Sequence, residues 1–337
     1  MDLNIANEMA NSSRYLPGQA AGFYESYFVR ANHPERPLAF WIRYTLFCPR
    51  NRPEEAVGEL WGVWFDGETG RHRVVKHVVP IAGCVFEPSG FNVRIGDAVL
   101  GPVSFQGRAA SGGHHMTWRM DYRGQEGPLF FLPLNRYTAR FPKAKSLVGM
   151  PMAIFNGFLA VDDKRYDITD WVGSQNHNWG EKHTREYAWG QVAGFDTHRD
   201  SFLEAATTCL YLGPLRLPSV TPLVLRHRGE EWSFNTFFRI CDSRGSYSPF
   251  TWVFGAEMRG LKIDGTVSAP RESFVGLAYK NPPGGVKHCL NTKIATCEIR
   301  IEDRRGKGIK REVLFTKNRA AFEILTDDQD HGVPILA

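Results

Sequence analysis

The 337-residue chain has none of the short motifs that commonly hold a nucleotide cofactor or a catalytic zinc ion. It contains no GxxxxGK[ST] phosphate loop, no dinucleotide-binding glycine fingerprint and no HExxH. The closest histidines are adjacent or five or six residues apart: His114 and His115, His72 and His77, and His177 and His183. No cysteine or carboxylate completes a compact ligand set around any of these pairs. We therefore expect neither a metal nor another cofactor.

Signals for secretion and for membrane insertion are also lacking. The amino end, MDLNIANEMANSSRYLPGQ, has no basic start followed by an apolar segment. The longest apolar run, residues 147–161, is interrupted by Pro151 and Asn156 and is shorter than the roughly 20 residues of a transmembrane helix. The six cysteines form no CxxC pair, which is typical of reduced thiols. We expect a cytoplasmic protein without a transmembrane segment, although contact with a membrane surface stays open.

Charge and composition narrow the class of protein further. The net charge is only +5, and no basic block is interleaved with aromatic residues, so nucleic acid is not an expected partner. Apolar residues make up 42% and charged residues 23%, as in ordinary globular proteins. Aromatic residues reach 13%, with 23 Phe, 11 Tyr and 9 Trp, which favours strands and ligand cavities walled by rings.

Short runs of aromatic and β-branched residues follow one another along the whole chain. Residues 23–32, 38–48 and 56–66 are such runs, separated by turn sequences such as NHPERP and DGETG. The pattern continues in the second half, in residues 201–212, 230–241, 250–265 and 273–279. We find no helical pattern longer than two turns. Short apolar runs separated by turn sequences predict an all-β protein built as a sandwich or barrel.

The length allows two domains of ordinary size. A boundary between residues 171 and 194 would divide the chain into two similar β-domains, which we set at 12–180 and 181–337. A proline-rich alternative boundary lies at residues 212–222. The stretch DRRGKGIKR is predicted to be the exposed tip of a hairpin.

The segment GSQNHNWGEKHTREYAWGQ, residues 173–191, combines imidazole, indole and amide groups. Because side chains alternate along a strand, His177 and Trp179 should share one face, and Asn176 and Asn178 the other. An imidazole can relay a proton, and an indole face attracts positive charge. The functional interpretation is a ligand pocket. The structural alternative is a core tryptophan whose neighbouring histidine binds a backbone carbonyl.

The next run and a later glutamate extend the predicted pocket. Tyr187, Trp189 and Gln191 should share a face, and with Asn178 they are the expected substrate contacts. Glu204 lies in the otherwise uncharged run FLEAATT. Burial would favour its neutral form, which can donate a proton to an alkene or a carbonyl. The alternative places Glu204 on the solvent face of an edge strand.

Other polar residues are interpreted as structural. Ionisable residues in the first three strands form either a buried salt-linked network or a solvent-exposed face: Glu25, Arg30, Arg43 and Glu59. In YKNPPGGVKHCLNTK, a hairpin is predicted in which Asn291 and Lys293 cap a strand.

The sequence resembles the carotenoid 1,2-hydratase (hydroxyneurosporene synthase) and AttH-like family. The likeness rests on NHNWG after DITDWVGSQ, on YAWGQ, on YESYFVRANHPERPLAFWIRYT and on YKNPPGGVKHCLNTK. Tocopherol cyclase and lipocalin-like Diels–Alderases are more distantly similar. The resemblance implies two tandem lipocalin-like antiparallel β-barrels, a pocket near their junction, polyene or terpenoid substrates and no redox cofactor.

In the hydratases of that family the motif histidine and tryptophan are implicated in catalysis, together with a tyrosine and an aspartate on a following strand. His177 and Trp179 match the first two. The Tyr-x-Asp pair is missing, and Glu204 is the only acid in the corresponding strand. Asn176 stands where the family often has an acidic residue. These differences weaken the case for hydration of a carotenoid in particular.

Two functions remain open at this stage. The first is a cofactor-independent cyclase, isomerase or hydratase of a hydrophobic polyene or terpenoid. Glu204 would supply the proton, His177 would relay or position it, and Trp179, Tyr187 and Trp189 would shape the substrate. A pericyclic variant needs no acid, because holding the substrate in a reactive fold can supply about 7–11 kcal/mol. The second function is a lipid or terpenoid carrier without catalysis.

Overall fold

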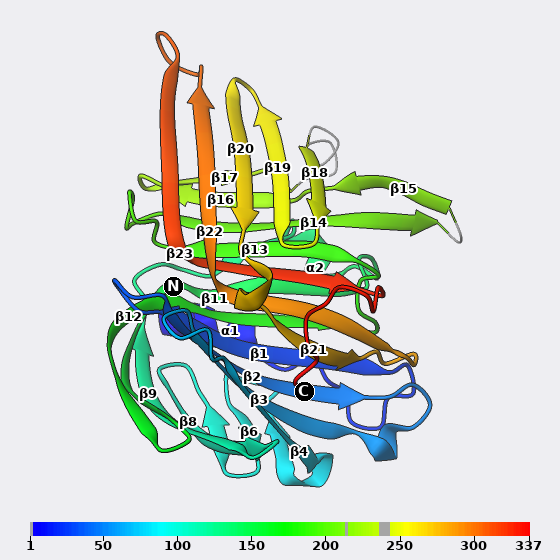
Figure 1. The fold of residues 1–337 in the computed structure, drawn as a ribbon. Helices are drawn as coiled ribbons and strands as arrows, with labels where there is room; N and C mark the ends of the chain where they lie inside the picture. Colours follow the sequence, from blue (N-terminus) through cyan, green and yellow to red (C-terminus); the bar gives the residue numbers. More distant parts are fainter. Residues whose placement is uncertain (1–2, 213–214, 236–242) are drawn as a thin grey trace.

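The computed structural model describes residues 3–212, 215–235 and 243–337, and these residues are almost entirely β-structure. Two antiparallel sheets, A and B, follow each other along the chain (Figure 1). The predicted all-β fold class is confirmed. No helix among the described residues is long and apolar enough to cross a bilayer.

Sheet A contains the first twelve strands. They are β1 (Phe23–Asn32), β2 (Leu38–Cys48), β3 (Val57–Asp66), β4 (Arg73–Pro80), β5 (Cys84–Phe86), β6 (Val93–Ile95), β7 (Ala98–Leu100), β8 (Ser104–Ser111), β9 (His114–Arg123), β10 (Leu129–Phe130), β11 (Ala144–Val161) and β12 (Lys164–Gly180). Their order is β4-β3-β2-β1-β12-β11-β9-β8-β7-β6-β5, with β10 on β11. The sheet curls into a nearly closed barrel. Large apolar side chains fill it, including Phe40, Trp64, Trp118 and Phe155.

Sheet B contains β13 (Tyr187–Ala193), β14 (Phe202–Leu212), β15 (Leu215–Val220), β16 (Leu223–His227), β17 (Glu230–Ser233), β18 (Ser243–Ser248), β19 (Thr251–Met258), β20 (Leu261–Ser268), β21 (Val275–Lys280), β22 (Val286–Asp303) and β23 (Lys310–Thr326). Its order is β17-β16-β14-β13-β23-β22-β20-β19-β18, with β15 on β14 and β21 on β22. The register of β22 against β23 shifts around Ala295. The first half of β22 pairs with β21 and its second half with β20. Of the predicted strand 230–241, residues 236–241 lie outside the described part of the chain.

The first half of β22 and the second half of β23, with β13 and β21, pack on the outer face of β1, β2 and β3 (Figure 1). We call the side chains buried between these two groups of strands the junction layer. It includes Phe28, Trp41, Trp61, Leu277, Tyr279, Cys289 and Leu325. Strands β1 and β2 are therefore buried on both faces, one inside the barrel and one in the junction layer. This double burial explains their nearly continuous apolar sequence.

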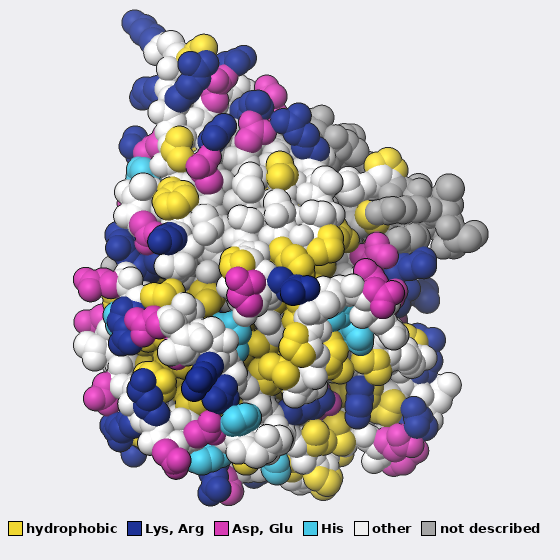
Figure 2. All heavy atoms as spheres, in the orientation of Figure 1, with side chains coloured by type: hydrophobic (Ala, Val, Ile, Leu, Met, Phe, Trp, Pro, Cys, Tyr) yellow, Lys and Arg dark blue, Asp and Glu magenta, His cyan; other side chains and the backbone are white. Residues whose placement is uncertain are grey.

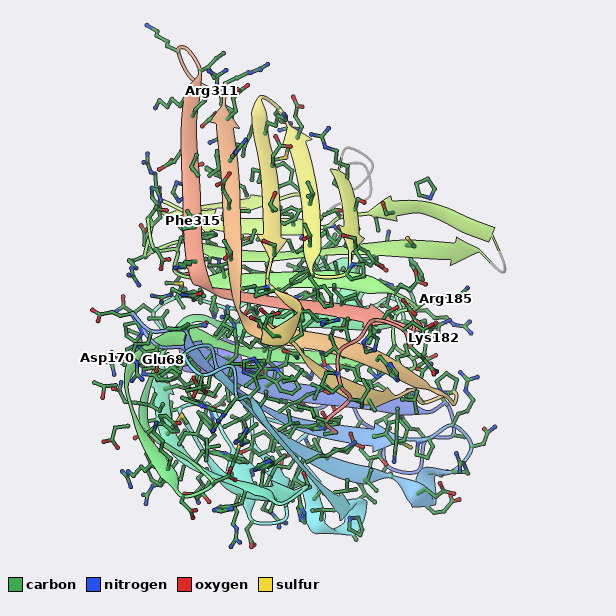
Figure 3. All side chains as sticks on the ribbon, viewed as in Figure 1. Glu68, Asp170, Lys182, Arg185, Arg311 and Phe315 are labelled. Carbon is green, nitrogen blue, oxygen red and sulfur yellow. The ribbon has the colours of Figure 1, made fainter. Side chains whose placement is uncertain are left out.

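The chain crosses from sheet A to sheet B between the end of β12 and the start of β13. Lys182 and Arg185 mark this connection, at the opposite edge of the molecule from Glu68 and Asp170 (Figure 3). The predicted domain limits at 180 and 181 fall inside it. They stay a prediction, because β21 and the first half of β22 pack against the barrel as well as within sheet B.

The hairpin of β22 and β23 carries the basic tip predicted from the sequence. Residues 304–311 are exposed, and Lys and Arg side chains gather around this end of the molecule (Figures 2 and 3). The sequence pattern did not predict α1 (Leu3–Asn11), which has nine residues. Its buried residues are Asn7, Ala10 and Asn11, whereas Ile5 and Met9 are exposed, so the face toward the barrel is mostly polar. Contacts of Ala10 and Asn11 with the barrel hold it in place. The other helices are one turn long: α2 (Asn135–Thr138), η1 (Pro53–Glu55), η2 (Ile81–Gly83) and η3 (Arg271–Ser273).

Candidate functional site

His177 lies at the end of the barrel interior that α1 covers. Its partner across the β1–β12 ladder is Tyr27, and Trp179 stands opposite Glu25. The imidazole is fully buried between two rings, with centroid distances of 4.2 Å to Tyr27 and 4.6 Å to Trp179. The prediction that His177 and Trp179 share a face agrees with this geometry.

Both ring nitrogens of His177 face oxygen acceptors. Nε2 lies 2.9 Å from Glu25 Oε1, and Nδ1 lies 3.1 Å from the carbonyl oxygen of Ala10. A neutral imidazole has one N–H and can donate to only one of these oxygens. The geometry therefore describes a buried histidine–carboxylate pair whose ring is stacked between Tyr27 and Trp179.

Glu25 is held as a carboxylate by the segment that follows α1. Ser13 Oγ donates to Oε2 at 2.6 Å, and the backbone N–H of Arg14 donates to Oε1 at 2.8 Å. Burial raises the pKa of Glu25, but the hydrogen bond and charge of His177, together with these two donors, outweigh it and lower the pKa below its ordinary value. The Arg14 guanidinium lies over Trp179, 5.3 Å from the ring centroid. The residues before β1 thus complete the buried pair.

The opposite face of β12 carries a second polar group, which belongs to the junction between the sheets. Asn176 Nδ2 donates to Ser174 Oγ at 2.8 Å, and Gln191 Nε2 donates to Asn176 Oδ1 at 2.7 Å. Arg30 Nε donates to Gln191 Oε1 at 2.7 Å. Asn178 lies on the same face of the strand as Asn176, and its Oδ1 is buried without a partner among the described residues. Amide side chains thus join β1, β12 and β13.

Glu204 is at the centre of this second group. It is buried on β14, which pairs with both β13 and β16, so the alternative of a solvent-facing edge strand is wrong. Trp189 Nε1 donates to Oε1 and Gln191 Nε2 donates to Oε2, both at 2.8 Å. Burial raises the pKa of Glu204 to about 7, although the two donors and the charge of Arg30 act in the other direction. A carboxyl with this pKa carries its proton for much of the time at neutral pH.

Replacing Trp189 with phenylalanine should raise the pKa of Glu204 further. The indole N–H stabilises the carboxylate form, and phenylalanine keeps the ring but removes that donor. A pH titration of ¹³C-labelled glutamate carboxyl signals by NMR would measure the change. Trp232→Phe is the matched control, because its indole donates to the surface carboxylate of Glu230. An unchanged or lowered pKa in Trp189→Phe would contradict the assigned hydrogen bond.

A third polar group lies in the junction layer around Glu323 of β23. Lys293 Nζ and Asn291 Nδ2 donate to Glu323 Oε1, at 2.7 and 2.9 Å. The hydroxyl of Tyr187 lies 3.5 Å from Oε2 of the same carboxylate. The prediction that Asn291 and Lys293 cap a strand is wrong. Both lie in the interior of β22, because that strand continues for ten residues beyond Lys293. Both side chains are also completely buried.

The four early ionisable residues are all buried, so the solvent-exposed alternative is wrong for them. They also do not form one network. Glu25 pairs with His177 in the barrel, and Glu59 lies 3.1 Å from Lys76. Arg30 joins the amide group, whereas Arg43 donates to Ser26 at 2.6 Å. The pairing of strands explains the separation, since Glu25 and Arg30 lie on opposite faces of β1.

The predicted site residues thus fall into three sets. His177 and Trp179 lie inside the end of the barrel, whereas Asn178, Glu204, Trp189 and Gln191 lie on the junction side of β12. Tyr187 lies beside Glu323, in the third polar group. His177 and Asn176 are neighbours on opposite faces of β12, so the backbone of that strand separates the imidazole from Glu204. Sequence reasoning missed Glu25 as the partner of His177, and also missed Lys293 and Glu323. The alternation in YESYFV placed Glu25 on one face, but no local signal indicated pairing with a strand about 150 residues away.

No group of three or more potential metal ligands occurs within the described ranges. Two surface hollows stand out, of about 330 and 260 Å³. The first lies on β9 and β11 beside Tyr122 and Asn156, and the second at the basic hairpin tip. Neither is lined by a residue of the predicted site, whose side chains pack against one another.

Comparisons with known proteins agree on the fold. No protein-family model matches the chain. Two uncharacterized proteins from strains of Mycobacterium tuberculosis, Rv0493c and MT0513, are each 24% identical over 289 residues, which is 85% of this chain and 83% of each relative. A crystal structure of an AttH protein (NE1406) from Nitrosomonas europaea aligns over 93% of this chain and 99% of its own, with a TM-score of 0.53 and 11% identity. The chain shares the fold of that structure.

Two further structures share this fold. CghA, crystallised with Sch210972, aligns over 97% of both chains, with a TM-score of 0.57 and 10% identity. Kievitone hydratase from Nectria haematococca aligns over 95% of this chain and 98% of its own, with a TM-score of 0.54 and 12% identity. Identities this low establish the common architecture and leave the reaction open.

Proposed function

We propose that this protein is a cofactor-independent enzyme that acts on a hydrophobic polyene or terpenoid by cyclisation, isomerisation or hydration. The observation that carries the proposal is the buried Glu204 carboxyl, held by Trp189 and Gln191 in an aromatic-rich junction between two sheets. The shared fold with kievitone hydratase supports an enzyme of this general kind.

In the proposed reaction, protonated Glu204 gives its proton to a carbon–carbon double bond or a carbonyl oxygen of the substrate. Trp189 and Gln191 each donate to one oxygen of the resulting carboxylate, so the group that has lost its proton is stabilised. Indole faces in the junction layer favour the positive charge that develops on the substrate. Loss of a proton from that cation, or attack by water followed by loss of a proton, returns a proton to Glu204.

His177 has a different part in this proposal from the one expected. Because β12 separates it from Glu204, it acts as a positioning residue rather than as a direct proton relay. Its ion pair with Glu25 fixes the strand that presents Asn176 to Gln191. The second candidate function, a carrier of lipids or terpenoids without catalysis, is favoured by the missing Tyr-x-Asp pair.

The test is to identify what the purified protein carries, by native mass spectrometry followed by organic extraction. Wild type is compared with Glu204→Gln, His177→Ala and the control Glu257→Gln, which alters an exposed glutamate of sheet B. An acid-initiated enzyme should convert the recovered molecule in wild type and Glu257→Gln, and Glu204→Gln should be about 10²–10⁴-fold slower. Conversion by Glu204→Gln within a few fold of wild type would assign a pericyclic reaction.

The other outcomes decide against the enzyme. A molecule recovered unchanged from all four proteins would favour the carrier. In that case, if His177 anchors the ligand, His177→Ala should weaken ligand binding by about 1–3 kcal/mol. A protein that is empty and binds no polyene or terpenoid offered to it would contradict both functions.

A further inference from the structure

Three buried hydrogen-bond donors lie on one face of β2 and β3 without an acceptor among the described residues. They are the indole N–H groups of Trp41 and Trp61 and the Nε–H of Arg43. Arg43 stands directly opposite Trp61 in the ladder of the two strands, and Trp41 is two residues away on β2. All three side chains therefore share the face that forms the junction layer with β21 and β22. Their relative exposures are only 1% for each tryptophan and 5% for Arg43.

Arg43 is also a buried cation without a carboxylate partner in the described part of the chain. Its one hydrogen bond is from Nη2 to Ser26 Oγ, and its guanidinium lies over the ring of Tyr279, 4.5 Å from the centroid. The nearby acids have other partners: Glu59 pairs with Lys76 at 3.1 Å, and Glu323 with Lys293 at 2.7 Å. Buried donors and buried charges are normally satisfied, so three unsatisfied donors side by side need an explanation.

The chemistry of these groups specifies their missing partner. An arginine and two indoles are donors only, so the partner must be an acceptor. The ammonium groups of two lysines lie over the same indoles, Lys76 over Trp61 at 4.0 Å and Lys293 over Trp41 at 5.6 Å. Each lysine is balanced by its own glutamate, so the charge that favours a negative acceptor over a neutral one is that of Arg43, which has no carboxylate partner among the described residues. The rest of the junction layer is aromatic and aliphatic, which suits an apolar body attached to that acceptor.

We propose that Arg43, Trp41 and Trp61 bind the oxygen of a carboxylate or enolate carried by the hydrophobic substrate. The site rests on the proposed function and narrows it, because the ligand is then an oxygenated, acidic polyene or terpenoid and not a hydrocarbon. Charge-assisted hydrogen bonds from Arg43 and the two indoles hold the oxygen, and the apolar body packs against neighbouring rings such as that of Tyr279.

A series of ligands with one polyene skeleton tests the proposal. All-trans-retinoic acid, retinaldehyde and the hydrocarbon axerophthene are titrated into the full-length protein by isothermal titration calorimetry. The acid is expected to bind at least about 10-fold more tightly than the hydrocarbon, as one charge-assisted hydrogen bond allows. Trp61→Phe and Trp41→Phe keep the ring and remove the donor. Each is expected to weaken binding of the acid by about 10-fold while changing the affinity for the hydrocarbon less than about two-fold.

Trp64→Phe is the matched control. Its indole N–H is also buried without a partner, but Trp64 lies on the opposite face of β3, in the barrel core. Trp64→Phe should leave the affinity for the acid unchanged. Arg43→Gln should abolish the preference for the acid, and the two tryptophan variants keep the test decisive if Arg43→Gln does not fold.

The contradicting results separate this inference from the proposed function. Equal affinity for the acid and the hydrocarbon, unaffected by Trp61→Phe, would overturn the acceptor site and leave a polyene-binding protein in place. Equal affinity for the aldehyde and the acid would overturn the preference for an anion. Failure of wild type to bind any of the three ligands would overturn the acceptor site and the proposed function together.

Discussion

Glu25→Gln should lower the free energy of unfolding by about 3–5 kcal/mol, the loss expected when one partner of a buried ion pair is removed. Glu25 and His177 are both 0% exposed, and their nearest atoms lie 2.9 Å apart. The glutamine replaces a carboxylate that faces His177 and accepts from Ser13 and the backbone N–H of Arg14 with an uncharged amide, whose NH₂ group cannot accept. Urea unfolding of the two proteins at pH 7 measures the difference.

The double variant Glu25→Gln, His177→Gln provides the control. It removes both charges and leaves two amides that can bond to each other, so it should be more stable than Glu25→Gln alone. A loss of less than about 1 kcal/mol in the single variant would show that the pair is a neutral hydrogen bond. Because the pKa of Glu25 is lowered in the folded state, its contribution is complete above its ordinary value and is lost as the pH falls through the folded-state pKa.

The β-architecture was predictable because alternation and turn residues act locally. The predicted runs 23–32 and 38–48 coincide with β1 and β2, and the run 56–66 begins one residue before β3. In contrast, α1 turns a mostly polar face, with Asn7 and Asn11, toward the barrel, so a search for a buried apolar stripe did not identify it. The interior position of Asn291 and Lys293 was likewise not predictable, because a polar pair beside a Pro-Gly turn is typical of a strand end. The two side chains are buried because β22 packs against β2.

Within a single strand, the sequence predicted which candidate site residues share a face. Alternation correctly grouped His177 with Trp179, and Trp189 with Gln191. The assignment of His177 and Glu204 to one reaction needed the pairing of β12 with β1 and of β13 with β14, which no local pattern specifies. Once those pairings form, the backbone of β12 stands between the two groups. The pairing of β12 with β1 also brings Glu25 to His177, and the pairing of β2 with β3 places Arg43 beside two indoles.

The stability of the protein should fall as the pH rises from about 5 to 8, through Glu204. In the unfolded chain this carboxyl has an ordinary pKa of 4.5, and in the folded protein burial raises the pKa to about 7. Between these values the folded state binds more protons than the unfolded state, so raising the pH favours unfolding. The difference corresponds to about 3 kcal/mol at most, since each pKa unit is worth about 1.4 kcal/mol.

The contribution of Glu204 is isolated by comparison with Glu204→Gln. Free energies of unfolding from urea titrations at several values between pH 5 and 8 should show wild type losing about 3 kcal/mol relative to the variant. The variant keeps a side chain of the same shape that does not ionise, and all other titrating groups are common to both proteins. Glu257→Gln, at an exposed position, should follow wild type at every pH.

A stability difference between wild type and Glu204→Gln that does not change with pH would mean that Glu204 ionises normally in the folded state. The acid of the proposed reaction would then have to be sought elsewhere, first at His177 on the other face of β12.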